Sequence, residues 1–590
     1  MKNFRERYKQ QIKGLAEELR REKLPVLTEE LFSLFEKEGN RLNYEEVYFR
    51  RRKFLAVYGM AAYIFGKPED VAKLEEIILE ICEEECWALP AHVNRGLEHW
   101  RETVDLFAAE TAQALAEIIT LVNEGTAAGK PGQKQMSEQI CQRVREEVER
   151  RVFLPFERTK YGWECSDHNW NAVCCGSIGS AAMYLMAGKE EERLERMLKR
   201  ICHSLTFYLG GFREDGACME GIGYFTYGMT YFTGFAEQLL RYSQGSIHLF
   251  ASEKVRRIAE FQQKTYFRCG QTVSFSDGEK QAKFRMGLIC FLAEQYNTVR
   301  IPAKEFACDF ETDSCYRFMG LMRDYLWTTG TENRITDKER KGMTETVQAR
   351  HDILPEAQWS ICESRNGAGF AIKGGDNGEP HNHNDIGSFL YLAGGEQLIC
   401  DLGAGEYTKD YFGPGRYGIL CNSSEGHSVP VLGGTYQREG KQYRTSSFAA
   451  DGRGTTVLEF AGAYTEGVVK KLVRKTEFSL ENGSLGVADY FELPEEQFPG
   501  DYVTEQLVTQ GDVIWLREPE QEIRMVIQGE QAACRIEFPM AAEHLRVLEK
   551  EHSNHEGKKE IVRLIRWDVP VKQGNNCRYA ETEVLLTICE

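Results

Sequence analysis

Several features that would place a protein in a special class are missing from this chain of 590 residues. No uninterrupted apolar run is long enough to cross a bilayer, which argues against a membrane-spanning protein. Acidic residues outnumber basic ones by 91 to 73, and the net charge of -18 disfavours wholesale binding to nucleic acid or an anionic membrane. An anionic ligand therefore requires a locally basic site.

Metal-type cysteine spacing and an export signal are also missing. The 18 cysteines include no CxxC pair. Residues 1–9 carry basic side chains, but no apolar segment of the kind found in secretory signals follows them. We therefore expect reduced, buried thiols and a cytoplasmic protein of bacterial type.

The composition that remains is that of an ordinary globular protein. Hydrophobic residues make up 42% and charged residues 28% of the chain. The length suggests two to four domains, because a single hydrophobic core rarely grows to this size.

The first part of the chain, to about residue 347, has the periodicity of helices. Apolar residues recur every three or four positions, prolines are few, and polar breaks are short. We expect stacked helical hairpins without a detectable sequence repeat, and breaks at 129–132 and 328–330. The clearest helical stretches are 47–65, 71–82, 106–122, 181–186, 197–208 and 255–267.

The second part, from about residue 348 to 590, has short β-like runs with Gly and Asn turns between them. This spacing predicts an antiparallel sandwich, and the order of helices first and strands second predicts segregated domains, an α+β multidomain protein. The runs are 359–362, 369–373, 455–460, 468–473, 485–491 and 561–567.

Residues 381–389, HNHNDIGSF, bring two histidines, two asparagines and an aspartate together within nine positions. They lead into an apolar run, a Gly-Gly turn and a second run that ends on Asp401. On a strand, His381 and His383 would face the same side, an arrangement suited to metal binding or proton transfer. Paired buried imidazoles beside an acid are costly unless they bind something.

Three further segments combine polar and aromatic residues. They are 165–176 (CSDHNWNAVCCG), 215–228 (DGACMEGIGYFTYG) and 416–429 (RYGILCNSSEGHSV). Each alone has a structural explanation. Asn169 can cap a helix, Trp170 can pack in a core, and a lone His427 is more often structural than catalytic.

Together, these motifs resemble the heparinase II/III-like polysaccharide lyases. The resemblance rests on 381–389, 401–405 (DLGAG) and 424–429 (SEGHSV), together with 87–92 (WALPAH), 105–111 (DLFAAET) and the loops at 165–176 and 215–228. It covers most of residues 80–430. It implies an incomplete (α/α) toroid over 1–347 and an antiparallel β-sandwich over 348–590, with the active site between them.

The resemblance also implies the reaction. Family members cleave uronate-containing glycans by β-elimination, which needs neutralisation of the uronate carboxylate, a base for the C5 proton and an acid for the departing O4. It assigns the first task to Asn169, with His168 close behind. Tyr224 would be the acid and, for one uronate epimer, also the base, with Tyr227 as its rival. His381 would be the other base or a carboxylate ligand.

A supporting metal, most often zinc, is implied behind that histidine. Its ligands would be His383, Asp401 and His427, which fix the geometry of the site without performing the elimination. The alternative is that the three residues simply hydrogen-bond one another. Assigning His381 to the substrate and His383 to the metal requires the two side chains to face different sides. His381 must then precede the strand, in a loop where the alternation of side chains has not begun.

Substrate contacts are expected from both parts of the chain. Arg416 and Tyr417 lie between the metal candidates, and an arginine can grip a carboxylate or sulfate with two hydrogen bonds. Arg213, Trp170 and Glu220 are the candidates from the helical part.

The predicted function is therefore a lyase acting on an anionic uronate-containing oligo- or polysaccharide, with zinc as the supporting metal. Two alternatives stay open, a uronyl C5 epimerase using the same site and an inactive carbohydrate-binding protein. The expected cytoplasmic location favours imported oligosaccharides as substrates. The glycan, its sulfation, endo or exo cleavage, and a possible homo-oligomer are undetermined.

Overall fold

The computed structural model describes residues 2–127, 135–329, 348–495, 498, 500–517, 523–539, 542–574 and 577–589. Two compact units divide the chain. The helical unit comprises Met1–Gly211, Phe225–Arg256 and Lys283–Met343, and the β-rich unit comprises Phe212–Tyr224, Arg257–Ala282 and Thr344–Glu590. The β-rich unit thus draws on two segments, 212–224 and 257–282, that lie within the helical part of the sequence.

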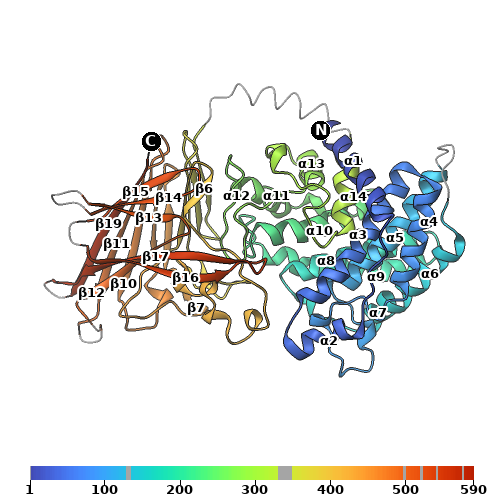
Figure 1. Ribbon diagram of the computed structural model, residues 1–590, viewed down its shortest axis with the longest axis horizontal. Helices are drawn as coiled ribbons and strands as arrows, with labels where there is room; N and C mark the ends of the chain where they lie inside the picture. The colour runs from blue at the N-terminus through green and yellow to red at the C-terminus, as the bar shows by residue number, and fades with distance from the viewer. Residues whose placement is uncertain are drawn as a thin grey trace. The chain divides into compact units, whose positions relative to one another are not determined.

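The α-helices of the described residues lie before residue 330 (Figure 1), and two of them show how the sequence sets their ends. Thr28 Oγ1 accepts a hydrogen bond from Leu31 N at the start of α2, and Gly39 and Gly66 end α2 and α3 in left-handed conformations. The helices are α1 Lys2–Leu19, α2 Glu29–Glu38, α3 Leu42–Phe65, α4 Pro68–Cys82, α5 Leu106–Ala127, α6 Glu138–Val148, α7 Leu154–Arg158, α8 Asn169–Met186, α9 Glu191–Gly211, α10 Ile222–Tyr242, α11 Glu253–Ala259, α12 Phe261–Thr265, α13 Met286–Gln295 and α14 Phe318–Leu326.

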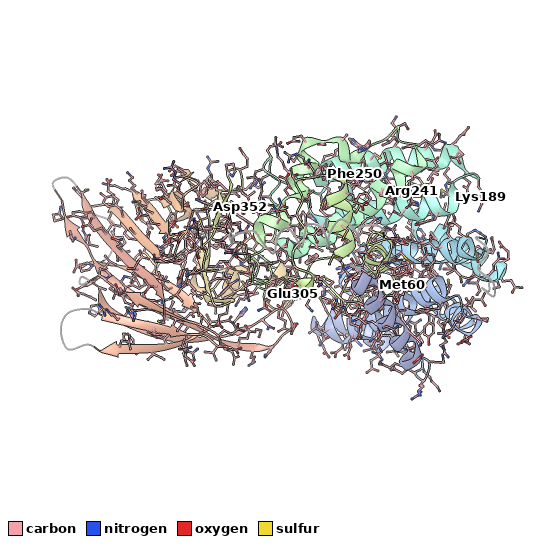
Figure 2. All side chains as sticks on the ribbon, turned by 90° about the horizontal axis from the view of Figure 1, so that it is seen from above. Met60, Lys189, Arg241, Phe250, Glu305 and Asp352 are labelled. Atoms are coloured by element: carbon pink, nitrogen blue, oxygen red, sulfur yellow. The ribbon has the colours of Figure 1, made fainter. Side chains whose placement is uncertain are left out.

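The core of the helical unit forms where helices approach closely. A Cβ added to Gly176 of α8 would lie 2.7 Å from the backbone oxygen of Tyr231 in α10, so only glycine allows this packing distance. Met60 of α3, labelled in Figure 2, has no exposed surface. The predicted helices at 47–65, 71–82, 106–122, 181–186 and 197–208 are confirmed.

One predicted helix, at 255–267, is interrupted. The chain forms α11 and the short α12, and Tyr266 then pairs with Thr272 in an isolated β-bridge. The helical periodicity does not describe this interruption, because the bridge closes a local turn between Phe267 and Gln271. Of the predicted break at 328–330, residues 328 and 329 follow α14, whereas residue 330 and the predicted break at 129–132 lie outside the described residues.

The β-rich unit is built from antiparallel sheets (Figure 1). A five-stranded sheet has the order β1-β2-β3-β5-β6, and a larger sheet has the order β13-β14-β15-β19-β11-β10-β9-β8, with β18 beside β19. Strands β12-β17-β16 and β4-β7 form two smaller sheets. The strands are β1 Arg350–Leu354, β2 Trp359–Glu363, β3 Gly369–Lys373, β4 Asp376–Asn377, β5 Phe389–Ala393, β6 Glu396–Ile399, β7 Gly440–Arg444, β8 Ser447–Ala450, β9 Thr455–Glu459, β10 Lys471–Phe478, β11 Leu485–Leu493, β12 Tyr502–Thr509, β13 Asp512–Arg517, β14 Ile523–Gln528, β15 Ala533–Glu537, β16 Glu543–Ser553, β17 Lys559–Pro570, β18 Lys572–Gln573 and β19 Arg578–Ile588.

The two larger sheets share one hydrophobic core, which makes the unit a sandwich. Phe370 and Phe389 of the five-stranded sheet lie in the same buried cluster as Phe478 and Phe491 of the larger sheet. Strands β10 and β11 alternate between buried and more exposed side chains, as expected for a sheet covered on one face.

The three central strands of the five-stranded sheet are covered on both faces, because β2, β3 and β5 are buried at every position. The segment 257–282 supplies part of this cover. The rings of Phe261 and Phe275 contact the ring of Trp359 in β2, with centroids 6.0 and 5.2 Å apart. This packing fixes the segment that carries Asp277.

The predicted fold class is confirmed: helices dominate the first part of the chain and antiparallel sheets the second. The cysteines are free thiols. Among the described residues, no helix has the length and apolarity needed to cross a membrane.

Candidate active site

Residues 381–388 lie in a loop of the β-rich unit between β4 and β5, and Phe389 begins β5. His381 therefore precedes the strand, as the division between His381 and His383 requires. The segments 212–224 and 257–282 contribute Glu220, Tyr224 and Asp277 to the same unit. The candidate site in this unit is thus assembled from stretches that lie far apart in the chain.

His381 is held between two carboxylates. Its Nδ1 lies 2.5 Å from Asp277 Oδ2, and its Nε2 lies 3.4 Å from Glu220 Oε2. Burial opposes a charge on the imidazole, but hydrogen bonds to Asp277 and Glu220 raise the pKa of His381 to about 9. At neutral pH this side chain is a cation, which suits it to hold an anion and not to remove a proton.

Tyr224 is in direct contact with that cation. The rings of Tyr224 and His381 are stacked with centroids 4.2 Å apart. The Tyr224 hydroxyl lies 2.5 Å from the hydroxyl of Tyr407, which donates to Asp277 Oδ2 at 2.9 Å. Tyrosine, imidazolium and carboxylate therefore form one connected hydrogen-bond network.

The other oxygen of Asp277 faces the metal candidates. Oδ1 accepts hydrogen bonds from His383 Nε2 at 3.0 Å and from the Tyr411 hydroxyl at 2.5 Å. Burial by itself would raise the pKa of Asp277, but hydrogen bonds from His381 and His383 hold it well below the usual range. Asp277 is therefore an anion with no exposed surface.

A group of buried side chains next to this network has the composition of a metal site. Ligand atoms of His383, Asp385 and His427 all lie within 4.8 Å of one another. Asp401 Oδ2 lies 3.3 Å from His427 Nδ1, so the carboxylate predicted as a ligand borders the same group. Two imidazoles and one or two carboxylates are a normal ligand set for a divalent metal ion.

The hydrogen bonds of the two imidazoles also fit a metal. His383 Nε2 is bound to Asp277 and His427 Nε2 to the Cys421 carbonyl at 2.7 Å. Among the described residues, His383 Nδ1 has no hydrogen-bond partner, and His427 Nδ1 faces only the Asp401 carboxylate at 3.3 Å. Metal-bound histidines usually donate their other nitrogen to a carboxylate or carbonyl, which leaves the ligating nitrogen unprotonated. A mutual hydrogen bond between His383, Asp401 and His427 does not explain the unpartnered His383 Nδ1.

Asp385 differs from Asp401 in having a lysine beside it. Lys373 Nζ lies 2.8 Å from Asp385 Oδ1 and 3.8 Å from Glu379 Oε2, and both side chains of the closer pair are buried. Arg213, a predicted substrate ligand, lies 3.0 Å from Glu379 Oε1. Burial raises the pKa of Glu379 to about 7 even though Lys373 opposes this shift.

Arg416 and Tyr417 lie against the histidine loop. The Arg416 guanidinium donates to the Asn382 carbonyl at 2.9 Å and to the Tyr411 carbonyl at 3.0 Å. The Asn382 amide nitrogen lies 3.4 Å from the Tyr417 hydroxyl. Arg416 thus braces the loop, and substrate binding by Arg416, Tyr417 and Arg213 stays a prediction.

Four other predicted residues belong to the helical unit. Asn169 is the first residue of α8 and is buried, and His168 precedes it at the cap position without a side-chain cap bond. The Trp170 ring contacts the His92 ring with centroids 4.8 Å apart, and His92 Nδ1 lies 2.7 Å from Asp105 Oδ2. The roles predicted for Asn169, His168 and Trp170 stay predictions.

Tyr227, the rival of Tyr224, has a different partner. Its hydroxyl donates to Glu110 Oε1, and the Arg317 guanidinium lies 4.1 Å from the centre of its ring. Burial and then the charge of Glu110 raise the pKa of Tyr227 well above its ordinary value. Burial also raises the pKa of Glu110 to about 7. A tyrosine in this setting loses its proton with difficulty.

The sequence analysis did not identify Asp277, Tyr407, Tyr411 or Asp385. Asp385 lies within the segment 381–389, and Tyr407 and Tyr411 follow Asp401 closely in the sequence. A signal for Asp277 does exist: the alternating run 272–275 is followed, after Ser276, by Asp277-Gly278, a strand-like stretch and turn within a helical context.

Comparisons with known proteins bear on the fold. No protein-family model matches the sequence, and no protein with a curated description is similar to it in sequence. Among solved structures, the heparan sulfate lyase HepC from Pedobacter heparinus aligns at a TM-score of 0.57 and 13% identity, over 92% of this chain and 77% of that chain.

Two further solved structures align with this chain. A heparinase III aligns at a TM-score of 0.60 and 10% identity, over 98% of this chain and 89% of that chain. The chondroitin AC lyase of Streptomyces coelicolor A3, determined in complex with chondroitin sulphate, aligns at 0.53 and 11% identity, over 98% and 78% of the two chains. The expected likeness to heparinase-like lyases is confirmed at the level of the fold.

Proposed function

We propose that this protein is a lyase that cleaves a uronate-containing oligo- or polysaccharide by β-elimination. The observation that carries the proposal is the contact between Tyr224 and His381, whose rings lie 4.2 Å apart within one hydrogen-bond network. Three structures with this fold are named as a heparan sulfate lyase, a heparinase III and a chondroitin AC lyase. The fold alone does not fix an activity, so the argument rests on the site.

Elimination first requires that the uronate carboxylate be neutralised, because this makes the C5 proton acidic. His381 is a cation at neutral pH, and its Nε2 faces Glu220 at the longer of its two contacts, 3.4 Å. A substrate carboxylate can take the place of Glu220 at this nitrogen. We therefore favour His381 as a carboxylate ligand over His381 as a base, and assign Asn169, with His168 as the alternative, to the same task from the helical unit.

Tyr224 is proposed as the residue that moves the proton. In its phenolate form it removes the C5 proton, the C5–H electrons form the C4=C5 double bond, the C4–O4 bond breaks, and Tyr224 returns the proton to O4. A phenolate is normally scarce at neutral pH, since the pKa of tyrosine is about 10. We therefore propose that this form arises beside the stacked His381 cation.

A divalent metal, with zinc as our proposal, would be held by His383 and His427 with Asp401 or Asp385. When bound, it would neutralise the buried carboxylates and fix the imidazoles, a structural contribution. In this chain, His383 also donates to Asp277, and Asp277 holds His381. The residues of the metal group therefore orient the residues of the reaction.

The experiment is a screen of uronate glycans and oligosaccharides for the ultraviolet absorbance of an unsaturated uronate. We expect product with the wild type and a loss of about 10²–10⁴-fold with His381→Ala and Tyr224→Phe. His351→Ala is a matched control, because His351 is a buried imidazole of β1 that hydrogen-bonds Ser360. Full activity of both site variants would contradict the assignment.

The same screen in deuterated water separates the open alternatives. A C5 epimerase would place deuterium at C5 without producing a double bond, and an inactive binding protein would retain glycan without either change. Either result in place of ultraviolet-absorbing product would replace the proposed function.

A further inference from the structure

We propose that Asp277 is the positioning residue of this site and that Tyr407 is the link through which it orients Tyr224. The inference deepens the proposed function and rests on it. Asp277 lies 104 residues before His381 in the chain, yet it contacts His381 and His383 and reaches Tyr224 through one hydroxyl.

The backbone around Asp277 is fixed by close packing. A Cβ on Gly403 would lie 2.1 Å from the Gly278 carbonyl oxygen, and a Cβ on Gly221 would lie 3.0 Å from the Gly278 Cα. Ser276 has a positive φ of 58°, a conformation that non-glycine residues rarely adopt. The carboxylate is therefore presented from a rigid turn, and substitutions at either glycine would displace it.

Both oxygens of the Asp277 carboxylate accept hydrogen bonds from protein donors. Oδ2 accepts from His381 Nδ1 at 2.5 Å and from Tyr407 at 2.9 Å, and Oδ1 accepts from His383 Nε2 at 3.0 Å and from Tyr411 at 2.5 Å. An ionised carboxylate offers about four acceptor positions. Since all are occupied and the side chain is buried, Asp277 has no oxygen left for a substrate and acts through its neighbours.

The direction of each proton follows from this arrangement. A tyrosine hydroxyl carries one proton, and Tyr407 gives its proton to Asp277. In the 2.5 Å contact between Tyr224 and Tyr407, Tyr224 is therefore the donor in the resting state. Asp277 thus determines, through Tyr407, where the reactive hydroxyl points.

His381 is oriented by the same carboxylate. A carboxylate can only accept, so His381 Nδ1 donates and Nε2 is directed to Glu220, the side we assign to substrate. The backbone of His381 has a positive φ of 55°, and such conformations persist where surrounding contacts hold them. The ring is held by Asp277 on its edge and by Tyr224 on its face.

The chain itself offers a matched pair of variants. Tyr407→Phe and Tyr411→Phe each remove one hydroxyl that donates to Asp277, but only Tyr407 also contacts Tyr224. We expect Tyr407→Phe to lower kcat about 10²-fold with little change in KM. Tyr411→Phe should lower kcat by less than about tenfold, the effect of one hydrogen bond. Equal losses in the two variants would overturn the link through Tyr407.

A spectroscopic readout tests Asp277 independently of activity. The Nδ1 proton of His381, hydrogen-bonded to a buried carboxylate, should give a low-field proton resonance in the wild type, identified by its absence in His381→Ala. Asp277→Asn should remove this resonance, and Tyr411→Phe should retain it. A resonance that survives in Asp277→Asn would overturn the proposal.

The two readouts separate the failure of this inference from failure of the proposed function. If no uronate glycan yields product but the resonance depends on Asp277, the proposed function fails and the positioning role stands. If product forms and Asp277→Asn keeps both the resonance and the wild-type kcat, the positioning role fails and the proposed function stands. Metal content, measured by mass spectrometry in each variant, shows whether a loss of kcat arises only from metal loss through His383.

Discussion

Two buried carboxylates in this protein each receive a tyrosine hydroxyl, but their surroundings differ. Asp277 in the β-rich unit accepts from two imidazoles and two tyrosines, and its pKa is held well below the usual range. Glu110 in the helical unit accepts from Tyr227 with Arg317 3.5 Å away, and burial raises its pKa to about 7.

The difference lies in the number of donors around each carboxylate. Four close donors outweigh the cost of burying Asp277 as an anion, whereas the hydroxyls of Tyr227 and Tyr231 and a more distant guanidinium do not do so for Glu110. Tyr224 and Tyr227 lie one turn apart in α10, so this contrast, and not their place in the sequence, separates them. Asp277 defines a fixed charged centre and Glu110 a site that titrates near neutrality.

The largest expected effect separates the two tyrosines. Tyr224→Phe should lower kcat about 10²–10⁴-fold, because the hydroxyl that moves the proton is lost. Tyr227→Phe should lower it less than about tenfold, because its hydroxyl is committed to Glu110. Both rates come from the ultraviolet assay, and a reversed order would transfer the catalytic role to Tyr227.

The second-largest effect is expected when Asp277 is replaced, and it concerns the stability of the fold. Asp277→Asn should lower the free energy of unfolding at pH 8 by about 3–5 kcal/mol, because it leaves His381 and His383 without their anion. A depressed carboxyl pKa stabilises the fold above the unfolded-state pKa of about 4, and this contribution is lost as the pH falls through the folded-state pKa. Denaturant unfolding measures this at pH 8 and at the lowest pH where the fold persists. The difference in the free energy of unfolding between the wild type and Asp277→Asn should be smaller at the lower pH.

Removal of the metal group should have a smaller effect on activity. His427→Ala or treatment with a chelator should reduce metal content and lower kcat about 10–100-fold, because the imidazole of His383 loses a fixed partner. Metal analysis by mass spectrometry accompanies the rate measurement. Wild-type activity in a metal-free protein would show that the buried group acts through hydrogen bonds alone.

The smallest effect concerns Glu110 and has the opposite sign. A raised carboxyl pKa stabilises the fold fully below the unfolded-state pKa, and this stability is lost as the pH rises through about 7. At pH 8, Glu110→Gln should therefore raise the free energy of unfolding by about 1–2 kcal/mol relative to the wild type and raise the melting temperature. This gain in stability should fade towards pH 5. A thermal melt at both pH values checks this, and destabilisation at pH 8 would show that Glu110 is a compensated anion like Asp277.

Local patterns predicted the elements and part of the site. The apolar periodicity of residues 47–65 gave α3, and the Gly394-Gly395 turn gave the β5–β6 hairpin. The motif around His383 and His427 placed both imidazoles in one buried group, to which the structure adds Asp385. These succeed because a period or a short motif is a property of neighbouring residues.

The contacts of Asp277 could not be predicted from local sequence patterns. Tyr224 and Tyr407 are 183 residues apart, and Asp277 lies in a segment that the sequence assigns to the helical part. Such contacts depend on glycines that let separate backbones approach and on the cover of the five-stranded sheet. Hydrogen-bond saturation of a carboxylate has no local sequence signal.

The sequence by itself determined the order of helices and antiparallel strands, the histidine motif and the class of chemistry its residue types allow. Only the tertiary structure decided which carboxylate holds His381, that this histidine is a cation, and that Tyr224 and Tyr227 have different partners. The physical reason is that secondary structure follows from interactions over a few residues, whereas charge state and proton direction follow from burial and from donors brought together across the chain.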